Sequence, residues 1–160
     1  MNLQSLLNRT ITPGMKTALM GIGSRLRSDD WAGMYFIELL DDLKKRDNLL
    51  LVSASTAPEN FTGVIKDFAP DALFIIDAAH MGLSPGEFRL LKTSEIGGMT
   101  FSTHMLPLPV MLKYLEAECG SEVFFIGIQP ETTEQGLSMS EKVICGTREL
   151  ARIFREVLSR

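Results

Sequence analysis

KTALMGIGSRLRSDDWAG, which spans Lys16–Gly33, is the stretch of sequence that decides the fold. Its apolar start predicts a buried strand over Thr17–Met20, and the glycines that follow predict a turn. Asp29 and Asp30 come next and open a helix. Because a strand–loop–helix junction of this kind places side chains at the carboxyl edge of a parallel sheet, we expect a functional site at that edge.

The rest of the chain alternates between apolar runs that predict strands and amphipathic runs that predict helices. The further strands are expected over Leu49–Val52, Ala72–Asp77, Glu87–Lys92 and Val123–Ile128. Helices are expected over Trp31–Lys45, Phe61–Phe68, Leu106–Glu118 and Ser140–Leu158. Ser28 is the expected N-cap of the first of these helices, and Ser140 that of the last. An irregular loop is expected over Thr93–Thr103.

This alternation favours an α/β fold, a three-layer αβα sandwich around a mostly parallel five-stranded sheet. A short turn joins Glu87–Lys92 to the strand before it, so we expect this segment to be the one antiparallel, edge-side strand. The 160 residues suit a single domain, expected over residues 15–160. An N-terminal arm over residues 1–14 precedes it, with apolar side chains that can dock on the domain.

Charge and composition exclude several classes of function. The net charge is -4 and the chain has no basic block, so nucleic acid is not an expected partner. No run of about 18 apolar residues is present, so no membrane span is expected. Cys119 and Cys145 form no disulfide framework, and the N-terminus has no signal-peptide pattern. We therefore expect a cytoplasmic protein, and favour a monomer.

Three polar residues follow or border different strands at the predicted carboxyl edge: Asp30, Asp77 and His104. Each has a simpler interpretation. Acids in a first helical turn, such as Asp29 and Asp30, are stabilised by the helix dipole by about 0.3–1 kcal/mol. Asp77 could cap a turn, although a carboxylate that ends a buried strand is costly unless it is paired or coordinating. His104 could be solvated or capping, and His80 has a weaker claim to the site than His104.

Taken together, two carboxylates and one imidazole form a ligand set with open positions, suited to Zn, Ni, Mn or Fe and to the activation of water or a carbonyl. From the residues alone, a metal-dependent hydrolase is the leading interpretation. A nucleotide-binding domain is the rival. Gly21-Ile22-Gly23 begins a dinucleotide fingerprint, but Leu26 stands where its third glycine should be, and no acid ends the second strand.

Five stretches resemble one known family. They are GIGSRLRSDDWAG (Gly21–Gly33), STAPEN (Ser55–Asn60), LFIIDAAHMGLSPGEFRLL (Leu73–Leu91), STHMLPL (Ser102–Leu108) and FFIGIQPE (Phe124–Glu131). In this order they resemble the maturation endopeptidases of NiFe hydrogenases over nearly all of Met15–Leu158, and most closely the branch that acts on the hydrogenase-3 type of large subunit.

The resemblance implies a protease that removes a C-terminal extension from the large-subunit precursor once the metal centre is in place. It also implies that Asp30, Asp77 and His104 are the catalytic and nickel-contacting residues, whereas His80 has no counterpart. The nickel would be supplied by the precursor, and no tightly bound resident metal is expected. Asp29 would assist the site or only favour the helix terminus. The alternative is a non-catalytic metal-sensing module that binds the same precursor without cutting it.

The sequence also departs from the family pattern at a few positions. Ser24 stands where the family usually has Asn, Trp31 where it has Gly, and Ala54-Ser55 where it has Gly-Gly. Loss of glycine narrows the conformations open to a loop. These differences concern loop geometry and the choice of substrate, not the ligand set.

Overall fold

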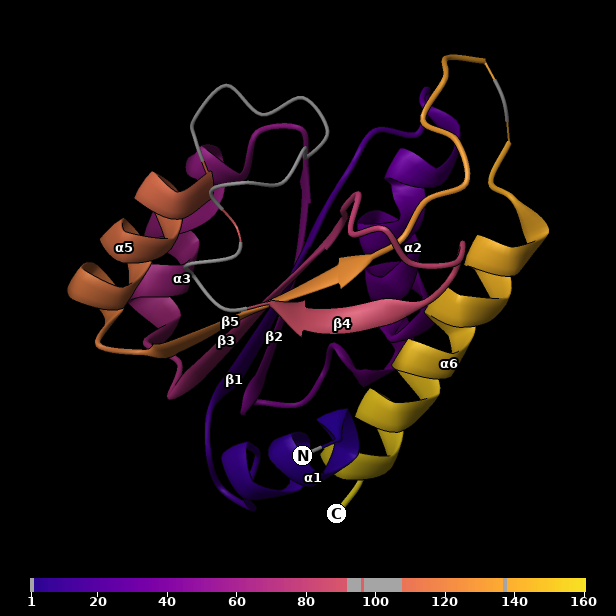
Figure 1. Cartoon of the computed structure of the whole chain (residues 1–160). Coiled ribbons are helices and arrows are strands. Elements are labelled where there is room, and N and C mark those ends of the chain that lie inside the picture. Colours follow the sequence, from indigo (N-terminus) through magenta and orange to yellow (C-terminus); the bar gives the residue numbers. More distant parts are fainter. Residues whose placement is uncertain (1, 92–95, 97–107, 137) are drawn as a thin grey trace.

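In the computed structural model, which describes residues 2–91, 96, 108–136 and 138–160, five strands form one sheet in the order β2-β1-β3-β5-β4 (Figure 1). The strands are β1 (Thr17–Ile22), β2 (Leu49–Ser55), β3 (Ala72–Ala78), β4 (Phe88–Leu91) and β5 (Glu122–Ile128). The first three pairings in this order are parallel, and β4 pairs with β5 antiparallel at one edge. The predicted fold class and the single antiparallel strand are confirmed.

Helices cover both faces of the sheet. The α-helices are α1 (Leu3–Thr10), α2 (Ala32–Leu39), α3 (Thr62–Phe68), α5 (Leu108–Cys119) and α6 (Glu141–Leu158), and the 3-10 helices are η1 (Ser28–Trp31), η2 (Asp41–Leu43) and η3 (Pro58–Phe61). Figure 1 shows α2 and α6 on one face and α3 and α5 on the other. Among the described residues, no helix is both long and apolar enough to cross a membrane.

Aromatic rings bind α2 and α6 to the sheet. Phe74 of β3 stacks on Phe124 of β5, with ring centroids 4.8 Å apart. Phe154 of α6 meets Phe74 edge-on at 5.3 Å and Phe36 of α2 edge-on at 5.2 Å. Edge-to-face and offset pairs of this kind contribute about 0.5–1.5 kcal/mol each beyond the burial of their area. The opposite face has a separate apolar core, in which Ile65 of α3 and residues of α5 cover β1 and β3.

The predicted N-terminal arm contains helix α1. Asn2 caps this helix, because its Oδ1 accepts the N–H of Ser5 at 2.8 Å. Leu7 and Ile11 are buried in the same core as α6, and Gln4 donates a hydrogen bond to Glu156. Apolar side chains of the arm thus pack in the core, and Figure 1 shows α1 beside the C-terminal end of α6.

Two details of the predicted helices are wrong. The loop predicted over Thr93–Thr103 is not among them, because it lies outside the described residues except at Ile96. The helix expected over Trp31–Lys45 is α2, which ends at Leu39 and is followed by the short helix η2. Ser28 is not an N-cap. It is the first residue of η1 with a left-handed φ of 47°, and its hydroxyl donates to the carbonyls of Thr132 and Glu134, whereas an N-cap oxygen accepts an N–H of its own helix.

Glycines allow α2 to begin directly against the strand ends. A Cβ added to Gly33 would lie 2.3 Å from the carbonyl oxygen of Ile76 and 2.4 Å from that of Ile22. A Cβ added to Gly21 would lie 2.2 Å from the carbonyl oxygen of Gly33. Backbone therefore packs on backbone where β1, β3 and α2 meet, which places η1 over the carboxyl edge of the sheet.

We predict that Gly33→Ala lowers the free energy of unfolding by about 3 kcal/mol or more, because the new methyl group meets two backbone carbonyls that have little room to move. The matched control is Gly63→Ala in α3, where an added Cβ meets nothing within 4 Å. Alanine is the better helix former, so this control should be neutral or gain about 0.5–1 kcal/mol. Urea unfolding measures both changes, and equal effects would contradict the role given to close packing.

Candidate functional site

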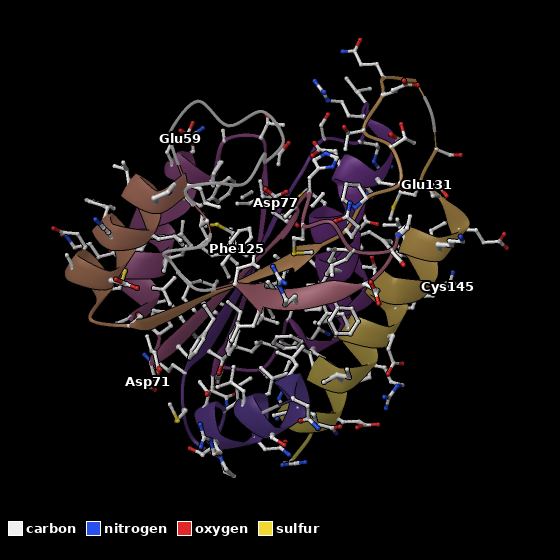
Figure 2. All side chains as sticks on the ribbon, viewed as in Figure 1. Glu59, Asp71, Asp77, Phe125, Glu131 and Cys145 are labelled. Atoms are coloured by element: carbon white, nitrogen blue, oxygen red, sulfur yellow. The ribbon has the colours of Figure 1, made fainter. Side chains whose placement is uncertain are left out.

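Two of the three predicted ligands lie at the carboxyl edge of the sheet. Asp30 is in η1 and Asp77 is the penultimate residue of β3, and these two elements are in contact. Both side chains are fully buried. Figure 2 shows Asp77 at the upper end of the sheet, at the opposite end from Asp71. The edge expected from the strand–loop–helix junction is therefore where the fold gathers buried acids.

The carboxylate of Asp30 is held on one side only. Its Oδ2 accepts the backbone N–H of Ser24 at 2.8 Å. Its Oδ1 is buried, and no donor among the described residues reaches it. Buried polar atoms almost always have a partner, and one without a partner often marks a functional site. This oxygen has the chemistry of a ligand for a cation that arrives from outside the chain.

Asp77 lies near the carboxyl end of the central strand, β3, and not in a loop. It pairs with Gly127 of β5, and its Oδ1 accepts the N–H of Ala78 at 2.8 Å. Strand β3 has β1 on one side and β5 on the other. This carboxylate is thus fixed by the most central strand of the protein, which limits its freedom to move.

His104 lies outside the described residues, so its place relative to the two acids stays a prediction. His80 follows β3 and is exposed. Within the described part of the chain, no three His, Cys, Asp or Glu side chains are grouped so that they could hold a metal ion. The described residues therefore form no metal site by themselves, and the third predicted ligand, His104, lies outside them.

Asp29, the other acid of the pair, turns away from Asp30 toward the loop before α6. Its Oδ1 accepts the N–H of Ser140 at 2.6 Å. Its Oδ2 accepts the hydroxyl of Ser140 at 2.7 Å and the N–H groups of Glu131 and Thr132 at 2.9 and 3.1 Å. Ser140 is the N-cap residue of α6, so the negative charge of Asp29 stabilises the N-terminus of α6. It was expected to stabilise the N-terminus of its own helix. Sequence reasoning could not identify this partner, because it lies more than 100 residues away.

Glu59 is a half-buried acid that the sequence patterns do not single out. It lies in η3, directly after β2, and its Oε2 is buried without a hydrogen bond from any described residue. Figure 2 places it on the same upper side of the molecule as Asp77. The one available signal was its position just beyond the end of a strand, inside the matched stretch STAPEN.

The departures from the family pattern have local explanations. Ser24 supplies the N–H that holds Asp30, a bond that any residue except proline can make. Trp31 lies under the Arg25 guanidinium at 4.4 Å from its ring centre, and Arg25 also pairs with Glu38. Ser55 adopts a left-handed φ of 54°, a conformation that glycine adopts at lower cost. Ser55 also accepts the N–H of Gly23 through its carbonyl, which ties the β2 turn to the loop that leads to Asp30.

Comparison with known proteins identifies the family. The model of the HycI hydrogenase maturation proteases matches residues 34–158, a range that includes Asp77 and His104 and begins after Asp30. A putative hydrogenase maturation protease of Methanocaldococcus jannaschii is 34% identical over 150 residues, covering 89% of this chain and 88% of the relative. The hydrogenase 3 maturation protease of Escherichia coli K12 is 36% identical over 118 residues, covering 73% of this chain and 74% of the relative.

Solved structures give the same result. The crystal structure of a NiFe hydrogenase maturation protease from Thermococcus kodakarensis superposes with a TM-score of 0.87 at 31% identity, covering 97% of this chain and 99% of that one. The matched family model covers most of the chain, and the relative from Methanocaldococcus jannaschii is matched over 88% of its own length. The protein is therefore a hydrolase of peptide bonds that belongs to the hydrogenase maturation protease family.

Proposed function

We propose that this protease removes the C-terminal extension of a NiFe-hydrogenase large-subunit precursor after nickel has been inserted, and that Asp30, Asp77 and His104 recognise the nickel. The observation that carries the proposal is the buried Oδ1 of Asp30, which has no donor among the described residues and lies in an element that contacts the strand of Asp77. A carboxylate oxygen in this state gains most from a cation. The relatives named above supply the reaction class and the kind of protein substrate.

The nickel belongs to the substrate. Two carboxylates and an imidazole leave coordination positions open, so the protease supplies part of a coordination shell and the precursor supplies the rest. Cys119 and Cys145, the two thiols in the chain, are not at this edge. Cys119 lies three residues before β5 begins, at the amino end of the sheet, and Cys145 is exposed on α6. The composition of the edge therefore favours a protease without a tightly bound resident metal.

Binding of the nickel would fix the distance from the site to the scissile peptide. The metal then polarises the peptide carbonyl, or a carboxylate acts as general base toward a water molecule. In either case water adds across the peptide bond, the carbonyl carbon becomes a carboxyl group, and the nitrogen leaves as an amine. Burial of both acids strengthens these electrostatic interactions, because the effective dielectric constant inside a protein is far below that of water.

We predict that nickel-loaded precursor is processed and that nickel-free precursor is not. The reason is that the open shell of Asp30 and Asp77 binds the substrate firmly only when the ion arrives with it, so metal and precursor bind with mutual dependence. Precursor mass before and after incubation measures removal of the tail. Prior treatment of the enzyme alone with a chelator should leave the rate unchanged.

Three results would count against this proposal. Equal cleavage of both precursor forms, or a stoichiometric metal that the purified enzyme needs, would make the protein an ordinary metalloprotease. Tight binding of the loaded precursor without any shortening would favour the alternative, a metal-sensing module that does not cut.

We also predict that Asp77→Asn lowers processing of nickel-loaded precursor by at least about a hundredfold, a loss of roughly 2.7 kcal/mol in transition-state stabilisation. The amide keeps the size of the side chain and its acceptor for Ala78, so the free energy of unfolding should change by less than about 1 kcal/mol. The matched control is Asp71→Asn, just before the opposite end of the same strand, where the carboxylate accepts the N–H of Lys16 at 2.8 Å. Similar loss of processing in both variants would show that activity does not depend on the carboxylate at the carboxyl edge in particular.

A further inference from the structure

We infer that Asp29 is a positioning residue for Asp30: it fixes the backbone of η1 so that Oδ1 of Asp30, which no described residue bonds, faces the nickel of the precursor. This inference rests on the proposed function, because it assigns Asp29 a role through the residue that recognises the metal. Asp29 itself is not a ligand, since its carboxylate oxygens accept four hydrogen bonds from the loop before α6.

The bonds between the two loops run in both directions. The side chain of Asp29 accepts from Glu131, Thr132 and Ser140, while its own N–H donates to the carbonyl of Thr132 at 3.1 Å. The hydroxyl of Ser28 donates to the carbonyls of Thr132 and Glu134 at 2.8 and 3.1 Å. Residues 28–29 and 131–140, of which 137 is not described, are thus held together as one unit.

The turn that follows β1 contacts Asp30 from the other side. The N–H of Ser24 donates to its carboxylate, and a Cβ added to Gly23 would lie 1.8 Å from its carbonyl oxygen. With Asp29 bound on one side and Gly23 packed on the other, the main chain of Asp30 has little freedom. A displacement of about 1 Å at a reacting group can cost a hundredfold in rate, so this fixation matters for the reaction.

The hydrogen bonds that join Asp29 to the loop before α6 require a carboxylate. Four donors converge on two oxygens, and an ionised carboxylate offers acceptor sites on both. In Asp29→Asn one oxygen becomes an NH₂ group. If the remaining oxygen faces Glu131 and Thr132, the NH₂ group meets the N–H of Ser140, which now lies 2.6 Å from Oδ1. The substitution keeps size and shape but places two donors against each other.

The chain contains a fluorescent residue beside Asp30 that can report on this position. Its single tryptophan, Trp31, is the residue directly after Asp30 and the last residue of η1. Quenching of its fluorescence by acrylamide reports how firmly η1 is held. Quenching by added Ni²⁺ reports binding beside Asp30 in the enzyme alone, without any turnover.

The test compares Asp29→Asn with the parent chain, with Asp30→Asn and with the double variant. Asp29→Asn should increase quenching of Trp31 by acrylamide, raise the half-saturating Ni²⁺ concentration several-fold, and lower kcat/KM on nickel-loaded precursor by at least about tenfold. In the Asp30→Asn background, Asp29→Asn should have no further effect on the Ni²⁺ titration, because two residues that act through one interaction are not additive.

Two further variants separate positioning from loss of stability. Val157→Ala removes buried volume near the C-terminal end of α6, away from the site, and should lower the urea midpoint without changing the Ni²⁺ titration or processing. Ser140→Ala deletes only the hydroxyl donor to Asp29 and should give a smaller change in the same direction as Asp29→Asn, including when Asp29→Asn itself does not fold.

The outcomes distinguish the two proposals. If Asp30→Asn changes the Ni²⁺ titration and processing but Asp29→Asn and Ser140→Ala behave like Val157→Ala, the positioning role is wrong and the proposed function stands. Additive effects of Asp29→Asn and Asp30→Asn on the titration would also overturn the positioning role. If Asp30→Asn changes neither measurement, the proposed function fails and this inference fails with it.

Discussion

The structure depends on a contact between backbone and backbone, where helix α2 begins against the ends of two parallel strands. Gly33 lies so close to the carbonyls of Ile22 and Ile76 that any side chain would collide with them. This contact joins α2, β1 and β3 at one point and places η1, with its two acids, over the carboxyl edge. The aromatic cluster around Phe74 and Phe154 then holds α2 and α6 on the same face of the sheet.

Two adjacent aspartates, both fully buried, have different tasks because they face different neighbours. Four donors surround Asp29, so its charge is satisfied within the protein and it joins two loops far apart in sequence. Asp30 has a donor at one oxygen, and the other has none from the described residues. Burial is costly for both carboxylates, and the described residues offset that cost more fully at Asp29 than at Asp30. In the function we propose, the cation of the substrate supplies the remaining stabilisation at Asp30.

Assignment to the hydrogenase maturation proteases and the geometry of the edge support each other. The family model and the solved relative cover the chain widely, which establishes the class of reaction. The geometry adds a buried carboxylate oxygen at the carboxyl edge, on which the function we propose depends. Departures from the family pattern, such as Trp31 beneath Arg25 and the left-handed Ser55, lie in the loops around Asp30 and leave its hydrogen bond from Ser24 in place.

Local sequence patterns determined the strands, the fold class and the edge at which the acids lie, because apolar runs and their spacing encode burial directly. They also singled out Asp77, since an acid at the end of a buried strand is unusual, and Asp30, since it follows another strand at the same edge. Only the tertiary structure decided that both oxygens of Asp29 have partners, because these partners lie more than 100 residues further along the chain. It also decided the end of α2 at Leu39 and the true role of Ser28, whose hydroxyl bonds across the fold. Hydrogen bonds between distant loops follow from packing, and no local spacing records them.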